Sequence, residues 1–169
     1  EEKSKEGNTV FFANGFECKI LTDSTVSISR MPVAYLTDAV TDSVFHIPAF
    51  VEYDGKTYQV REIAERGFTG SNNIKHLVID EGIKAINFRA FICCYNLESV
   101  RIPASLSFID YDIFGGCHNL KSIVVNPANK VFDSRDNCNA IIETEFNILV
   151  AGCGGSSIPS SVTTIGEAA

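Results

Sequence analysis

The chain has 169 residues, a formal net charge of −7, 45% hydrophobic residues and 21% charged residues. That composition provides enough apolar material for a folded core and too little charge for a disordered chain. The acidic balance, without any cluster of Lys and Arg, excludes nucleic acid as the main partner, because phosphate binding requires concentrated positive charge. Ile, Val and Phe dominate the apolar residues, with one Met and no Trp, which favours a protein rich in β-strands.

The first seven residues are charged and polar, unlike the start of a signal peptide, and we expect any export signal to have been removed. No run of residues reaches the roughly 18 to 20 apolar residues that cross a bilayer. The sequence therefore predicts no transmembrane segment.

Residues 1–61 lack the repeat described below and are predicted to form a β-rich N-terminal cap. Short strands are predicted at residues 10–12, 16–20 and 26–29, and a hairpin at residues 51–60 around an Asp-Gly turn. The cap is expected to cover the first repeat, because an open stack of strands would expose apolar core and unpaired backbone.

From residue 62 to residue 169, apolar residues recur with a period of 23. Across seven columns and three copies, 19 of 21 positions are hydrophobic, whereas a composition of 45% predicts about 9. A fixed period of this length indicates a solenoid. The columns include Phe68, Phe91 and Phe114; Cys94 and Cys117; Leu97 and Leu120; Leu77, Val100 and Ile123; and Ile79, Ile102 and Val125.

Each repeat is predicted to contain a short strand, a turn and a short helical or 3-10 segment. Residues 99–102 alternate between apolar and polar and end at a proline, which indicates a strand with Val100 and Ile102 inward. Residues 104–108 are predicted to be a turn, and residues 109–119 a short helix or 3-10 coil. Stacked about 4.8 Å apart, the strands form a parallel ladder, so the predicted fold class is an α/β solenoid.

One repeat carries an insertion of ten residues within residues 126–157, because the step from Val125 to Ile158 is 33 rather than 23. Residues 139–144 and 146–150 are predicted to form two strands joined by a turn, followed by a glycine-rich loop.

After the insertion, Ile158, Val162 and Ile165 are expected to restore the register of Ile102, Leu106 and Ile109. By the same offset, the counterpart of Phe114 would be residue 170. We therefore expect the solenoid of residues 62–169 to be truncated at its C-terminal end, and an open end of this kind predicts end-to-end self-association.

The repeat closes its strand with Ile-Pro at residues 102–103 and 158–159, a pair that also occurs at residues 47–48. Residues 90–97 read Ala-Phe-Ile-Cys-Cys-Tyr-Asn-Leu. This combination closely resembles the BspA-type leucine-rich repeats of bacterial surface proteins, over about residues 63–169. The resemblance implies a curved α/β solenoid, export to the bacterial surface or medium, and ligand binding without a catalytic centre.

The six cysteines form an even number, which permits disulfides in a secreted protein. Cys94 and Cys117 share a core column and are interpreted as small apolar fillers. A disulfide between them is awkward, because the Cβ atoms of stacked residues lie about 5 Å apart, beyond the usual 3.5 to 4.5 Å. Cys138 and Cys153 flank the inserted hairpin, and whether they are bridged stays open; Cys18 and Cys93 are expected to be unpaired.

No cofactor, metal or catalytic residue is predicted. A zinc site from Cys94, Cys117 and His118 would need four convergent ligands, and His118 is expected to point away from the inward cysteines. The loop at residues 152–157 lacks the Gly-Lys-Ser/Thr ending of a phosphate loop. Asp133 and Asp136 offer oxygen ligands without calcium-loop spacing, and calcium stays an alternative. No local signature of an activated nucleophile surrounds any cysteine.

The outward residues of stacked strands align in columns, and this surface is the predicted binding site. It suits contact with an extracellular or host protein, or with a glycan. The leading hypothesis is a non-catalytic, adhesin-like binding module of a secreted or surface-anchored bacterial protein; the alternatives are a spacer without its own ligand and an uncharacterised enzyme. The two columns are His76, Ser99 and Ser122, and Val78, Arg101 and Val124.

Overall fold

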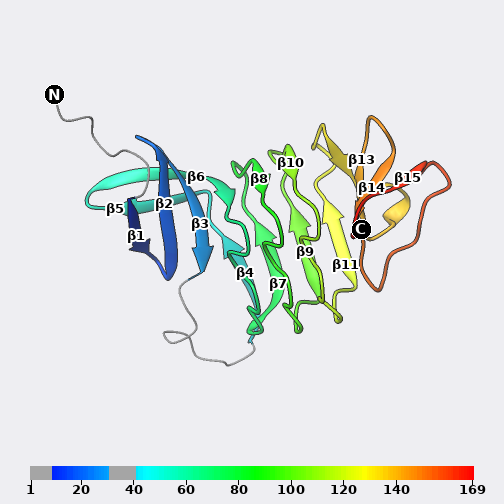
Figure 1. Cartoon of the computed structure of the whole chain (residues 1–169), viewed down its shortest axis with the longest axis horizontal. Helices are drawn as coiled ribbons and strands as arrows, with labels where there is room; N and C mark the ends of the chain where they lie inside the picture. The colour runs from blue at the N-terminus through cyan, green and yellow to red at the C-terminus, as the bar shows by residue number, and fades with distance from the viewer. Residues whose placement is uncertain (1–8, 31–40) are drawn as a thin grey trace.

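The computed structural model describes residues 9–30 and 41–169, and its centre is a ladder of parallel strands. In Figure 1 the four strands of this first ladder lie side by side. Adjacent strands pair in parallel, with Leu77 opposite Val100 and Val100 opposite Ile123. The repeat period therefore sets the strand register, as predicted. The strands are β4 (Thr41–Ile47), β7 (Ile74–Ile79), β9 (Ser99–Ile102) and β11 (Ser122–Val125).

A second parallel ladder runs along another side of the stack. It consists of β6 (Lys56–Ile63), β8 (Ala85–Ile86) and β10 (Phe108–Ile109), in that order. Ile63 pairs with Ile86, and Ile86 pairs with Ile109, so equivalent positions of successive repeats again lie side by side. The prediction that residues 104–108 are only a turn was wrong, because Phe108 begins a strand.

The predicted helical segments are absent from the described repeats, which have turns in their place. Within residues 9–30 and 41–169 the one helix is a 3-10 turn at Arg135–Asn137. The reason lies in the backbone hydrogen bonds: the amide of Phe68 donates to Ala90 (2.8 Å) and that of Phe91 to Ile113 (3.0 Å), in the next repeat. Amides used between repeats cannot form the i to i−4 bonds of a helix. The α/β assignment is corrected accordingly.

Two positions per repeat adopt a left-handed backbone, which also interrupts helix formation. The first is occupied by Arg66, Arg89 and Asp112, with φ of 52°, 54° and 57°. The second is occupied by Gly70, Cys93 and Gly116, with φ of 64°, 59° and 74°. Cys93 therefore adopts a backbone conformation that glycine occupies at the equivalent positions of the preceding and following repeats.

The core lies between the ladders and the turns and follows the repeat columns. The rings of Phe68 and Phe91 stack with centroids 5.4 Å apart, and those of Phe91 and Phe114 at 5.8 Å. Phe45 of β4 meets Phe68 edge to face at 6.3 Å, so the aromatic column continues toward the N-terminus. Buried residues of the other columns include Cys94, Leu97, Ile102, Leu120, Leu77, Val100, Ile123, Ile79 and Val125, with Cys117 partly buried.

A further column was missed from the sequence because it is polar. Asn96 donates its side-chain amide to the carbonyl of Asn72 (2.7 Å), and Asn119 donates to that of Tyr95 (2.6 Å). Asn73 occupies the same position one repeat earlier. Asn96 and Asn119 thereby satisfy carbonyls of the preceding turn, whereas the side-chain oxygen of Asn73 accepts a hydrogen bond from Arg30.

The N-terminal part contains the predicted strands. β1 (Val10–Ala13), β2 (Phe16–Thr22) and β3 (Thr25–Arg30) form an antiparallel meander, and β3 pairs in parallel with β6. β5 (Phe50–Tyr53) forms the predicted hairpin with β6. These strands lie at one end of the ladders in Figure 1.

β4 lies within the predicted cap segment but belongs to the first ladder. Ile47 is fully buried and pairs with Ile79, and the β5–β6 hairpin lies in the chain between them. The sequence separation between Ile47 and Ile79 is longer than the repeat period, and the additional residues form the hairpin. One continuous cluster of buried residues runs from Phe11 to Ala151. The N-terminal segment and the repeats therefore share a core.

The insertion forms a separate small sheet at the other end. β12 (Phe132–Asp133), β13 (Ile141–Glu143) and β14 (Ile148–Ala151) are antiparallel, which confirms the predicted pair of inserted strands. β15 (Thr164–Ile165) pairs in parallel with β14, not with a ladder strand.

The predicted return to the repeat register after the insertion was wrong. Ile158 lies outside any strand with 64% of its surface exposed, and Ile165 is 53% exposed, whereas Ile102 is buried. The inserted hairpin lies between these residues and the ladder, so the last segment packs on β14 instead.

The insertion also covers the edge of the first ladder. The hydroxyl of Ser134 accepts a hydrogen bond from the amide of Val125 (3.1 Å), and the amide of Gly154 donates to Leu120 (3.0 Å). A Cβ atom on Gly155 would lie 2.1 Å from the carbonyl oxygen of Lys121, so only glycine permits this approach. Side chains and loop backbone thus replace the next strand.

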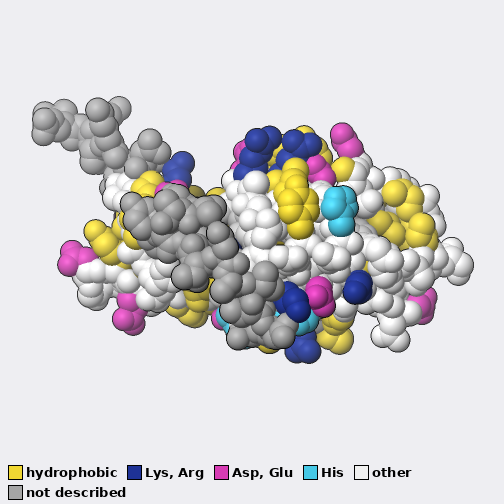
Figure 2. All heavy atoms as spheres, turned by 90° about the horizontal axis from the view of Figure 1, so that it is seen from below, with side chains coloured by type: hydrophobic (Ala, Val, Ile, Leu, Met, Phe, Trp, Pro, Cys, Tyr) yellow, Lys and Arg dark blue, Asp and Glu magenta, His cyan; other side chains and the backbone are white. Residues whose placement is uncertain are grey.

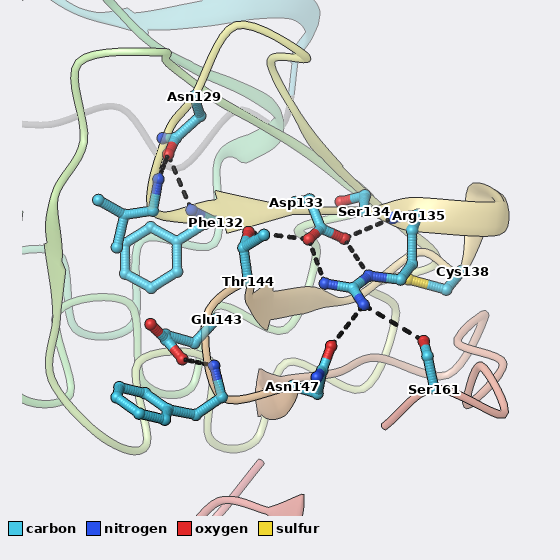
Figure 3. A network of polar contacts seen from close by, with 12 residues as sticks. Asn129, Phe132, Asp133, Ser134, Arg135, Cys138, Glu143, Thr144, Asn147 and Ser161 are labelled. Carbon is cyan, nitrogen blue, oxygen red and sulfur yellow. Dashed lines mark hydrogen bonds and ion pairs between the residues drawn. The ribbon is translucent and has the colours of Figure 1, made fainter. Parts of the chain in front are cut away.

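Asn129 occupies a column that holds Ile83 and Leu106 in earlier repeats. It is 9% exposed and makes four hydrogen bonds, as Figure 3 shows in part. Its amide donates to Pro103 and Leu106 (both 2.9 Å), and its oxygen accepts from the amides of Val131 and Phe132 (both 2.8 Å). This side chain fixes the point where the chain leaves the repeat.

Replacing Cys93 by glycine should stabilise the protein by about 1 kcal/mol, because glycine adopts the left-handed backbone without the penalty of a Cβ atom. Cys93→Ala keeps the penalty and serves as the control, with no gain expected. Chemical denaturation measures both; a Cys93→Gly variant less stable than the alanine variant would contradict the account.

Replacing Asn129 by leucine should lower the free energy of unfolding by at least about 2 kcal/mol, although leucine suits the column, because two buried amides and two carbonyls lose their partner. Asn119→Leu is the matched control: it removes one hydrogen bond at an exposed site, and a loss of about 1 kcal/mol or less is expected. Equal losses for the two variants in urea titrations would disprove the role of Asn129.

Candidate binding surface

The outward side chains of the first ladder form one surface, here called the strand face. Its rows follow from the pairings His76 with Ser99, Ser99 with Ser122, Val78 with Arg101 and Arg101 with Val124. The structure thus places the six residues chosen from the sequence in two adjacent rows. β4 extends both rows, since Val44 pairs with His76 and His46 with Val78.

The polar side chains of the two rows differ in whether they have a hydrogen-bonding partner within the protein. In the first row, the ring Nδ1 of His76 lies 2.8 Å from the hydroxyl of Ser99. In the second row, Nδ1 of His46 lies 2.8 Å from a carboxylate oxygen of Asp80. The side chain of Arg101 is exposed and makes no hydrogen bond or ion pair within residues 9–30 and 41–169. Its guanidinium group is free to meet a ligand.

A shallow groove of about 450 Å³ lies where the ladder strands end, and it includes three residues of the second row. Val78, Arg101 and Val124 contribute outward side chains, and Pro103 and Pro127 follow the strand ends. We call this the Arg101 groove; its other lining residues are Ile79, Asp80, Glu81, Ile102 and Asn126.

The acidic side chains of the Arg101 groove are occupied within the protein. Asp80 meets His46, and the carboxylate of Glu81 accepts hydrogen bonds from the amides of Ala104 (2.8 Å) and Ser105 (3.1 Å) and from the side chain of Asn126 (3.1 Å). Glu81 thereby ties three successive repeats together. Among the residues that the structure describes, the Arg101 guanidinium group is the charge of this groove without a partner.

The repeats match a known family model. Residues 52–149 match the BspA type leucine-rich repeat region in six copies, which is more than half of the chain. The chain belongs to this family of BspA-type leucine-rich repeat proteins.

A solved structure of a related repeat protein agrees with this fold. A leucine-rich repeat protein from Bacteroides ovatus is 26% identical, with a TM-score of 0.65 over 93% of this chain and 37% of that protein. The chain thus spans little more than a third of the Bacteroides ovatus protein.

More distant matches include a leucine-rich repeat protein from Bacteroides capillosus, which is 22% identical with a TM-score of 0.48 over 69% of this chain and 98% of that protein. A pneumococcal vaccine antigen, PcpA, matches at 14% identity and a TM-score of 0.43, over 95% of this chain and 61% of that protein. No curated protein matches the chain significantly.

Val44 and His46 are the strand-face residues that sequence reasoning missed. The available signal was Ile47-Pro48, which repeats the end of the BspA-type strand. The β5–β6 hairpin makes the sequence separation between Ile47 and Ile79 longer than the repeat period. The fixed period therefore does not relate these two residues, and the strand ending at Ile47 is not recognised as part of the ladder.

Polar and aromatic side chains outside the strand face also contact one another across the repeat stack. Figure 2 shows Lys and Arg side chains beside hydrophobic ones on the side seen from below. A group of stacked side chains joins three repeats: the guanidinium groups of Arg66 and Arg89 lie 5.7 and 4.7 Å from the ring centre of Phe88, and the ring centre of Tyr111 lies 4.5 Å from that of Phe88. Arg89 also pairs with Asp112 at 2.6 Å. These side chains contact one another and stabilise the packing of successive repeats.

The cysteines are free thiols that act in packing and hydrogen bonding. Cys94 donates to the carbonyl of Phe68 and Cys117 to that of Phe91, both at 3.1 Å. The contact with Cys117, together with burial, raises the pKa of Cys94, and burial raises the pKa of Cys18 to about 11. Cys138 and Cys153 are not bridged. The buried thiols of Cys18 and Cys94, with their raised pKa values, are poor nucleophiles.

His118 lies on the exposed turn side, where its ring stacks on Tyr95 at 5.9 Å. Within the described parts of the chain, no group of three or more His, Cys, Asp or Glu residues could hold a metal ion. The same residues contain no helix long and apolar enough to cross a membrane.

Asp133, one of the oxygen ligands noted in the sequence, is engaged by Arg135. Figure 3 shows the guanidinium group facing the carboxylate, with contacts of 2.8 and 2.5 Å, while its third nitrogen reaches Asn147 (2.6 Å). Thr144 also donates to Asp133 (2.8 Å). A positive charge thus stands where a calcium ion would have to bind. Arg135 joins the 3-10 turn to the inserted hairpin.

Burial by itself raises the pKa of Asp133, but the hydrogen bonds from Arg135 and Thr144 outweigh it and hold the pKa below its usual range. The unfolded chain has an ordinary pKa near 3.9. The unfolded state therefore binds more protons between the two values, and the stabilisation present above about pH 4 is lost as the pH falls through the folded pKa.

Asp133→Asn should thus destabilise the protein by about 1 kcal/mol near pH 7, and the difference from the unmodified protein should shrink toward about pH 2. Asp23→Asn, at an exposed turn without hydrogen bonds to the described residues, is the control and should show no such trend. Urea unfolding across this pH range provides the measurement; a difference that grows on acidification would refute the sign.

Proposed function

We propose that this domain is a non-catalytic, adhesin-like binding module of a secreted or surface-anchored bacterial protein, and that it contacts a partner protein through the strand face. The observation that carries the proposal is the second row of the strand face, where Arg101, whose side chain has no partner in the described part of the chain, lies between Val78 and Val124 in a groove. Arginine is enriched at protein interfaces, and the buried centre of an interface is more apolar than the rest of the protein surface.

The physical character of the strand face supports a contact surface. Val44 and Val124 are 51% and 46% exposed, which places apolar area on the two outer strands of the first ladder, each of which pairs with its inner neighbour. A rigid surface loses little conformational entropy when it binds. The contacts available to one such domain are modest, so binding would gain from several copies displayed together.

The proposed compartment is the one that the repeat family implies, since the BspA-type repeats that this chain contains resemble those of bacterial surface proteins. A leucine-rich cell surface protein from Faecalibacterium prausnitzii, at 14% identity and a TM-score of 0.33 over 87% of this chain and 62% of that protein, carries the same location in its name. We extend a surface or secreted location to this chain as part of the proposal.

The test replaces Arg101 and Val124 together by alanine and measures binding to immobilised extracellular-matrix proteins. We expect at least a tenfold weaker binding, which corresponds to about 1.4 kcal/mol. The matched control is Lys130→Ala with Ile158→Ala, which removes one exposed cation and one exposed branched residue away from the strand face.

Circular dichroism should show that both double variants remain folded. Undiminished binding by the Arg101 and Val124 variant would remove the strand face from the proposal. If the unmodified domain binds none of the proteins, while its removal from the full-length protein alters only the reach of another domain, the spacer role is supported instead.

A further inference from the structure

We infer that the Arg101 groove recognises a single carboxylate, from an Asp or Glu side chain flanked by apolar residues in the partner protein. This rests on the proposed function, and it specifies the chemistry of the ligand at that surface. The groove offers one guanidinium group with apolar side chains on both sides, so the complementary ligand presents one negative charge between apolar groups.

The first step concerns what Arg101 can bind. Its planar guanidinium group can donate two parallel hydrogen bonds to a carboxylate, a geometry that lysine lacks. Val78 and Val124 lie directly beside it in the neighbouring strands. When a partner covers these valines, water is removed from around the ion pair, and its hydrogen bonds become stronger.

The second step concerns why Arg101 is not already paired. Two carboxylates line the same groove, but Asp80 is held by His46 at 2.8 Å and Glu81 by two backbone amides and Asn126. Asn126 is itself committed, since its oxygen accepts from the amide of Ala128 at 2.9 Å. The polar groups around Arg101 are therefore satisfied, and binding a ligand breaks none of these bonds.

The third step concerns which anion fits. Asp80 and Glu81 leave their negative charges near the groove, in a chain of net charge −7. A phosphate or a polyanion carries more charge than one guanidinium group can compensate, and these neighbours would repel it. A single carboxylate carries one negative charge, which the one guanidinium group compensates. The apolar flanks favour a carboxylate on a peptide over a small free acid.

The experiment uses three peptides with blocked ends: Thr-Val-Glu-Val-Thr, the same peptide with Gln for Glu, and the same peptide with phosphoserine for Glu. Binding is followed by NMR through the side-chain Nε–H of Arg101 and the valine methyl groups. We expect saturable shifts with the Glu peptide and at least a tenfold weaker affinity for the Gln peptide. The phosphoserine peptide should bind more weakly than the Glu peptide.

Arg101→Gln should abolish the preference for Glu over Gln, and Arg101→Lys should retain part of it. Lys130→Gln, which removes an exposed cation outside the groove, should leave the preference intact. Equal binding of the Glu and Gln peptides, or a preference that survives in Arg101→Gln, would overturn the inference. Tighter binding of the phosphoserine peptide would overturn the choice of carboxylate.

The two proposals fail separately. If the unmodified domain binds a matrix protein through the strand face but does not distinguish the Glu and Gln peptides, carboxylate recognition is wrong and the proposed function stands. If the Glu peptide binds at Arg101 but adhesion is unaffected by Arg101→Ala with Val124→Ala, the groove is a carboxylate site and the strand face is not the adhesive surface.

Discussion

Backbone hydrogen bonding between equivalent positions of successive repeats is the constraint on which the structure depends. In both ladders each strand residue pairs with its equivalent in the next repeat, and the amides of the turns donate across the same step. Because equivalent residues must stack, each inward position holds a column of similar side chains. The aromatic column of Phe68, Phe91 and Phe114 and the thiol donors Cys94 and Cys117 follow from this requirement.

A stack of this kind leaves two open ends, and the chain departs from its period near each of them. One insertion forms the β5–β6 hairpin near the first ladder strand, and another forms the β13–β14 hairpin after the last. At the second site Ser134, Gly154 and the close approach of Gly155 satisfy the edge of β11. Covering the edge in this way prevents unpaired backbone from recruiting another strand.

The same stacking that builds the core organises the outer surface. Since inward and outward residues alternate along a strand, a ladder with an inward column also has outward rows, and side chains from distant repeats become neighbours. The strand face takes its residues from four strands in this way. Its distinctive feature is an electrostatic difference: the carboxylates of the Arg101 groove are occupied by internal partners, whereas the guanidinium group has none among the described residues.

The sequence by itself determined the period, the strand register, the residues of the core columns, the inserted hairpin and the two outward rows from His76 to Val124. These follow from hydrophobic periodicity, which is a local and repeated signal. The tertiary structure alone decided that the predicted helical segments are turns and a second ladder, because alternate amides of these turns bond to the next repeat and leave no continuous i to i−4 pattern. It also decided that β4 adds Val44 and His46 to the strand face, and that Ile158 leaves the register. Contacts between repeats also decide that Asp80 and Glu81 have partners, whereas the Arg101 side chain has none among the described residues. Neither the composition nor the repeat period encodes these contacts.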